Sequence, residues 1–112
     1  MELQKLFRKE LERMFDFISS FNEGLAWVIK DNKQYHVYPN GQPAYKERFD
    51  AVGSFIEGLA WVRKDGEEYH IRPNGQPAYK ERFDSVGSFY EGLAQVRKNG
   101  YHYQIHPNGT RV

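Results

Sequence analysis

The sequence predicts a mainly β fold made of three tandem repeats of about 34 residues, preceded by a short amphipathic helix. Phe21, Phe55 and Phe89 open three copies of one line, and the separations are 55−21 = 34 and 89−55 = 34. A fixed period of this length is typical of repeat proteins, whose units bury their apolar faces against one another. The aromatic content of 16% also favours strands.

The period divides a single domain, residues 1–112, into five segments. The helix belongs to residues 1–14 and a half-repeat to 15–20. The repeats are 21–54, 55–88 and 89–112, the last of which is truncated.

The helix is predicted from apolar residues that recur at spacings of 4, 4, 3 and 4 along the first segment and into the second. We place it at about residues 2–14, with Leu11 at the repeat position of Tyr45 and Tyr79. We expect it to stand in for an upstream repeat and to cover exposed apolar surface. The alternative is a partner-binding or dimerising helix. The recurring residues are Leu3, Phe7, Leu11, Met14 and Ile18.

Each repeat is expected to form a hairpin followed by a less regular return. In the second copy, 59–64 alternates as a strand, and Asp65-Gly66 suits a two-residue type I′ turn. A second strand, 69–72, is stopped by 73–75, Pro-Asn-Gly. The return, 76–84, is predicted to be one helical turn or a loop, and then a short strand.

Comparison of the copies indicates which strand faces are buried. Alanine at 26, 60 and 94 and valine at 28, 62 and 96 never vary, so we expect this face to be core. On the second strand, positions 35 and 37 keep their character in all copies, whereas positions 36 and 38 drift. We expect the drifting face to be exposed to solvent. Its members are His36, His70, Gln104, Tyr38, Arg72 and His106.

Two assemblies fit this pattern. In the open version the hairpins stack in a row with the helix at one end, which we favour because stacked repeats need caps. In the closed version, residues 9–20 complete the unit left unfinished at Val112, and a three-fold ring or trefoil-like barrel results. Pairing of 15–20 with 103–112 would identify the ring.

Composition argues against several functional classes. Sixteen basic and fifteen acidic residues leave a net charge of +1, without the positive field that nucleic acid requires. The absence of cysteine removes disulfides and thiolate chemistry. No apolar run near the amino terminus resembles a signal peptide or a membrane span, so we expect no membrane binding and, by default, a cytoplasmic protein.

No catalytic, metal or cofactor site is predicted. His36 and His70 share a position that Gln104 takes in the third copy, and a transition-metal site needs three or four convergent ligands. No nucleophile, base and orienting group recur together, so we expect no enzyme. A glutamate precedes glycine in each copy, and we expect its carboxylate to bind turn amides. These glutamates are Glu23, Glu57 and Glu91.

The string Phe-x-Glu-Gly-Leu-Ala-x-Val, then Lys-Asp-Gly, a Tyr-His-Ile strand, Pro-Asn-Gly and Arg-Phe-Asp-x-Val-Gly, resembles the bacterial WG-repeat (KWG-type) family over about residues 15–112. The resemblance implies short β-rich repeats with a binding or scaffolding role, and no particular ligand. One departure is that Gln34-Tyr35, Glu68-Tyr69 and His102-Tyr103 stand where such repeats commonly have Trp-Gly. We expect the tyrosines to supply the missing packing.

We expect the repeated surface to bind an unidentified protein or peptide. Trp27 and Trp61 share a position and would align as an aromatic strip. The other interpretation is that each ring packs on a neighbouring repeat, with Gln95 in the last copy. Alternatives are a glycan-binding module using the same strip, and a structural or homo-oligomerising role through the helix. The candidate ligand-binding residues are Trp27, Trp61, His36, His70, Tyr38 and Arg72.

Overall fold

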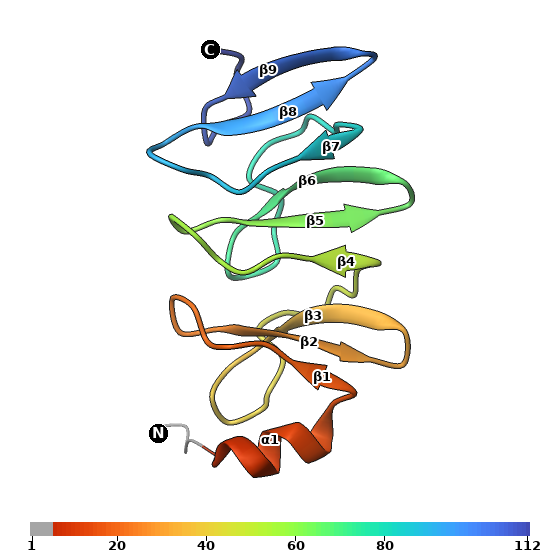
Figure 1. Ribbon diagram of the computed structural model, residues 1–112, viewed down its shortest axis with the longest axis vertical. Coiled ribbons are helices and arrows are strands. Elements are labelled where there is room, and N and C mark those ends of the chain that lie inside the picture. The colour runs from red at the N-terminus through yellow and green to blue at the C-terminus, as the bar shows by residue number, and fades with distance from the viewer. Residues whose placement is uncertain (1–5) are drawn as a thin grey trace.

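The computed structural model describes residues 6–112 and shows three small antiparallel sheets in an open row, with a helix at one end (Figure 1). The row measures 44 × 27 × 20 Å. Each sheet contains three strands in chain order. They are β1 (Phe17–Ile18), β2 (Ala26–Lys30) and β3 (Lys33–Val37); β4 (Ala51–Val52), β5 (Ala60–Lys64) and β6 (Glu67–Ile71); and β7 (Ser85–Val86), β8 (Ala94–Lys98) and β9 (Tyr101–Ile105).

The open row confirms the predicted fold class and shows that the ring alternative is wrong. β1 pairs with β2, with Phe17 opposite Ile29, and not with residues 103–112. The sheets group residues 17–37, 51–71 and 85–105. The first strand of each sheet therefore comes from the segment that precedes the division at residue 21, 55 or 89.

The central hairpin of each sheet closes through the predicted two-residue turn. Asp65 and Gly66 have φ values of 53° and 80°, the left-handed conformation that a type I′ turn requires at both positions. Asp31-Asn32 and Asn99-Gly100 repeat this geometry. Val62 lies opposite Tyr69 in the register that results.

The core follows the face that does not vary between copies. The alanine and valine side chains of β2, β5 and β8 are at most 3% exposed, which confirms that prediction. Strand partners on the same face, such as Val37, Ile71 and Ile105, are 0% exposed. Because side chains alternate along a strand, the residues between them point to the opposite face of the sheet.

The return segment joins consecutive sheets. It is a loop followed by a short strand, and residues 38–50 contain no helical turn. Phe49 exchanges two backbone hydrogen bonds with Gln34 on β3, of 2.9 and 3.0 Å. Two residues later the chain enters β4, which pairs with β5. The return therefore covers the outer edge of one sheet and begins the next.

The helix α1 (Arg8–Met14) is shorter than predicted. Leu6 and Phe7 precede it in the structure, and the predicted positions 2–5, including Leu3, lie outside the described residues. Phe7 N–H donates to Glu10 Oε1 at 3.1 Å and so closes the first turn. Leu11 is 2% exposed and belongs to the core.

The helix occupies the place of an upstream return, as predicted. A Cβ built on Gly41 would lie 2.7 Å from Met14 Cε and 3.4 Å from Leu11 Cδ2. One repeat later, a Cβ on Gly75 would lie 2.7 Å from Tyr45 Cβ. Leu11 and Met14 therefore pack on the first sheet where Tyr45 packs on the second, and α1 acts as a cap.

Gly53 and Gly87 offer a matched test of the close packing around Trp61. A Cβ at Gly53 would fall 2.1 Å from Trp61 Nε1, whereas one at Gly87 meets nothing nearer than Gln95 O at 3.8 Å. We expect Gly53→Ala to lower the free energy of unfolding by about 1–3 kcal/mol, because the indole must move. Gly87→Ala should be neutral or slightly stabilising. Urea unfolding followed by circular dichroism compares the two, and equal effects would contradict this packing.

Candidate functional site

His36 and His70 lie inside the stack, so the expectation that their strand face is exposed is wrong for them. Both side chains are 0% exposed. Tyr45 donates its hydroxyl to His36 Nδ1 at 2.5 Å, and His36 Nε2 donates to Gly53 O at 2.8 Å. A carbonyl only accepts, so Nε2 carries the proton of a neutral imidazole. Each histidine therefore links its own return segment to the next sheet.

The second histidine repeats this arrangement one period later. His70 binds the Tyr79 hydroxyl at 2.5 Å and Gly87 O at 2.8 Å. The Phe89 ring lies 4.5 Å from the His70 ring between centroids. Burial lowers the pKa of both His36 and His70 to about 4, although the bonded carbonyl opposes that shift. These rings are neutral connectors near pH 7 and have no access to solvent.

At the first sheet, an arginine of the cap takes the place of the histidine. Arg8 Nη1 donates to Ser19 O at 2.8 Å, and Arg8 Nη2 donates to Ile18 O at 2.5 Å. Ser19 stands one period before Gly53, whose carbonyl accepts from His36. The cap therefore reproduces a polar contact between repeats as well as an apolar one.

Trp27 and Trp61 are half-buried, each against the start of its own sheet. The Trp61 indole lies over Gly53, and the Trp27 ring contacts Phe17 with centroids 4.9 Å apart. Gly53 belongs to the preceding repeat in the sequence division, yet its backbone N–H binds Trp61 O at 2.9 Å. Each ring combines packing with an accessible side.

Tyr38 and Arg72 follow the ends of β3 and β6, where both are exposed. Arg72 lines a cavity of about 490 Å³ with Glu57 and Pro107, and no tryptophan lines it. The six predicted residues thus occupy three settings: half-buried on the sheets, buried between repeats, and exposed beyond the strands. The strand register brings four of them together in pairs, Trp27 opposite His36 and Trp61 opposite His70. The role of all six in binding stays a prediction.

The glutamate that recurs before glycine in each copy forms a ladder of hydrogen bonds between repeats. Glu23 Oε1 accepts the Gly58 N–H at 2.9 Å. Glu57 accepts two N–H groups, from Glu91 at 2.6 Å and from Gly92 at 2.8 Å. The expectation that these carboxylates bind turn amides is confirmed for Glu23 and Glu57, and the amides belong to the next repeat. It is not confirmed for Glu91, whose carboxylate accepts no hydrogen bond from the described residues.

The first sheet carries a partly exposed apolar cluster, of which the predicted set of ligand-binding residues includes only Trp27. We call it the Phe17 patch and define it as Phe17, Trp27 and Ile29. Phe17 is 47% exposed and lies opposite Ile29, which is half-buried. The corresponding positions become progressively more polar along the stack. They are Ala51, Trp61 and Arg63 in the second sheet and Ser85, Gln95 and Arg97 in the third.

Comparison with protein families matches the description "WG containing repeat" at residues 11–33, 39–67 and 71–101. The chain belongs to the WG-repeat family. Each match crosses one of the divisions that the period places at residues 21, 55 and 89, and the first match includes Leu11 of the cap. The comparisons with curated proteins and with solved structures found no match.

Of the three tyrosines expected to supply packing in this WG-repeat chain, two are buried and Tyr103 is half-buried. Tyr35 and Tyr69 are 6% and 8% exposed. The Arg48 guanidinium carbon lies 3.7 Å from the centre of the Tyr35 ring, within the range of a cation–π contact. Arg82 covers Tyr69 at 3.7 Å, and Arg111 covers Tyr103 at 4.2 Å.

Residues 6–112 offer neither a metal-binding cluster nor a membrane-spanning helix. No group of three or more histidine or acidic side chains in this part of the chain could hold a metal ion. None of its helices has the length and apolar character needed to cross a membrane.

The buried histidines predict a specific loss of stability in mild acid. Their pKa is about 4 in the folded chain and 6.5 ordinarily, so the unfolded chain takes up protons first as the pH falls. Stability present above about pH 6.5 should be lost towards pH 4, by up to ~1.4 kcal/mol per pH unit for each histidine.

Urea unfolding at several pH values tests this prediction. The free energy of unfolding is compared between the unsubstituted chain, His36→Gln, His70→Gln and the double variant. Glutamine is the residue of the third copy at position 104. Each substitution should reduce the number of protons taken up on unfolding, which sets the slope of the unfolding free energy against pH, by about one. An unchanged slope in the double variant would show that other groups cause the acid sensitivity.

Proposed function

We propose that this WG-repeat chain is a non-enzymatic interaction module that binds a protein or peptide on the tryptophan-bearing face of its sheets. The observation that carries the proposal is the Phe17 patch, three adjoining apolar side chains on one sheet face, of which Phe17 is exposed and Trp27 and Ile29 are half-buried. Adjoining exposed apolar groups mark binding surfaces far more often than scattered ones.

The surroundings of the patch support this proposal. Strands and two-residue turns hold the backbone of the patch in a fixed conformation. Little conformational entropy is therefore lost when a partner binds. On the second sheet, Arg63 and Glu68 form an ion pair of 2.6 Å beside Trp61. An apolar centre bordered by polar groups is the usual composition of an interface. Aromatic residues at such a centre commonly supply most of the binding energy.

The proposed surface omits His36 and His70, because both are 0% exposed. Trp27 and Trp61 form its axis, and Tyr38 and Arg72 lie beyond the ends of strands on either repeat. A partner that extends from the first sheet to the second would contact both tryptophans. The proposed partner therefore carries an apolar or aromatic anchor for the Phe17 patch.

The other functional hypotheses predict different behaviour. A glycan-binding module would use the same tryptophans but would require hydroxyl-rich ligands. An oligomerising role through α1 would require an apolar face other than that of Leu11, which the cap already uses. Two large apolar side chains remain exposed here: Phe7, immediately before α1, at 82%, and Met14, at the end of α1, at 38%.

The third repeat offers a matched design for testing the patch. The triple variant Phe17→Ser, Trp27→Gln and Ile29→Arg gives the first sheet the residues that the third sheet has at these positions. Peptides selected from a random library on the unsubstituted chain should contain aromatic or large aliphatic residues. We expect their affinity to fall at least about tenfold for the triple variant, a loss of about 1.4 kcal/mol.

Circular dichroism provides the control that the triple variant is folded. The variant Gln95→Trp, which adds an indole to the third sheet, serves as a second control and should leave affinity unchanged. Equal affinity of the selected peptides for the unsubstituted chain and the triple variant would refute the proposed surface. Fluorescence changes with oligosaccharides, but not with peptides, would support the glycan alternative.

A further inference from the structure

The glutamate ladder has an unfilled position at the first sheet. In the second and third sheets, Gly58 and Gly92 donate their N–H groups to the carboxylates of Glu23 and Glu57. The corresponding amide of the first sheet is Gly24, and no side chain among residues 6–112 accepts from it. Glu23 and Gly24 have φ values of 50° and 81°, and Glu57 and Gly58 have 52° and 83°. The first turn thus has the backbone shape that binds a carboxylate elsewhere in this chain.

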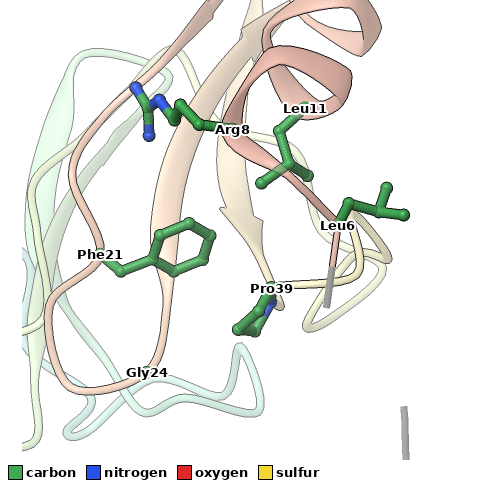
Figure 2. Close-up of a pocket in the computed structure, with 6 residues that line it drawn as sticks. All are labelled: Leu6, Arg8, Leu11, Phe21, Gly24 and Pro39. Carbon is green, nitrogen blue, oxygen red and sulfur yellow. The ribbon is translucent and has the colours of Figure 1, made fainter. Parts of the chain in front are cut away.

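An apolar cavity adjoins this turn. It has a volume of about 400 Å³ and is lined by Gly24, Phe21 and Pro39 on the sheet side. Figure 2 shows Phe21 and Pro39 between Gly24 and the residues of the cap. Leu6, Arg8 and Leu11 complete the lining from the cap. This volume is within the usual range of small-molecule sites.

A later junction shows which side chains line this kind of space. At the second junction, a turn that contains Glu57 and Leu59 lines a cavity together with Pro107. Pro107 and Pro39 hold the same repeat position. Beside Pro39, the cap supplies Leu6 and Leu11 but no glutamate turn among the described residues. A carboxylate on an apolar stem is therefore the chemistry missing from the first junction.

We propose that the cavity between α1 and the first sheet binds a carboxylic acid that has an apolar body. The carboxylate accepts the Gly24 N–H, and the body lies on Phe21, Pro39 and Leu6. Hydrogen bonds to a charged acceptor are about twice as strong as neutral ones. Arg8 adds positive charge to the wall, while its Nη atoms stay bound to backbone carbonyls. The site shares no residue with the Phe17 patch and is independent of the proposed function.

Two sources offer this chemistry, a free aliphatic acid and the terminal carboxylate of a peptide that ends in an apolar residue. The two are distinguished by separate titrations with octanoate and with the tripeptide Ala-Ala-Leu. The full chain, labelled with ¹⁵N, is observed by two-dimensional NMR. The Gly24 amide should move downfield on binding, and the Gly58 and Gly92 amides, which already have carboxylate partners, serve as internal references.

Controls separate the contributions of charge and body. Octanol lacks the carboxylate, acetate lacks the body, and amidated Ala-Ala-Leu lacks the terminal charge. We expect each to bind at least about tenfold more weakly than its parent ligand. The matched variants Leu6→Gln and Leu6→Glu have nearly equal size and differ in charge. Leu6→Glu should weaken octanoate binding at least about tenfold relative to Leu6→Gln, because it brings a second carboxylate into the cavity.

Three results would overturn the proposal. One is an unmoved Gly24 amide at saturating octanoate and Ala-Ala-Leu, and another is an equal shift with octanol. The third is a Gly24 shift caused by Glu2→Gln without added ligand, since the chain's own Glu2, which lies outside the described residues, would then be the occupant. The triple variant of the Phe17 patch should bind octanoate normally, so failure of one proposal leaves the other intact.

Discussion

Hydrogen bonds that cross from one sheet to the next hold this molecule together. A three-stranded sheet with strands of two to five residues has too little apolar surface to be stable alone. Its neighbours must complete it. At each of the two internal junctions, a buried neutral histidine binds a carbonyl of the next sheet, and a glutamate binds an amide of the next turn. A third link runs from Gln34 or Glu68 to the N–H of Val52 or Val86.

These polar links fix the spacing of the repeats more strictly than apolar packing would. Apolar contacts tolerate small shifts, whereas a buried donor or acceptor that loses its partner costs about 1–3 kcal/mol. Among the described residues, no buried side-chain nitrogen or oxygen lacks a partner. A register shift at a junction would break several bonds at once. The constant period of 34 residues follows from this requirement.

Local rules predict much of the fold. The turn at Asp65-Gly66 and the buried alanine and valine face follow from backbone preference and alternation, and the structure has both. The start of α1 was harder to predict, because Leu6 and Phe7 keep the apolar spacing of a helix but lie before it. Their neighbours at 2–5 lie outside the described residues.

The candidate site was less predictable than the fold. Variation from His36 and His70 to Gln104 predicts solvent exposure, but the two histidines are buried because each has a sheet after it to bind. No described sheet follows β9. The three positions of the Phe17 patch also vary between copies, and only the first sheet has apolar residues at all three of them. Variation of a residue between copies therefore indicates a change in the elements packed against it as readily as it indicates exposure to solvent.

The cap has a consequence for the length of such proteins. Arg8 and Leu11 present to the first sheet the contacts that His36 and Tyr45 present to the second. A whole unit inserted or deleted between the cap and the last sheet would therefore meet compatible surfaces on both sides. Duplication or loss of a complete unit preserves every junction, whereas a partial one destroys at least one. Copy number is thus the property that this architecture can change most readily while keeping its fold.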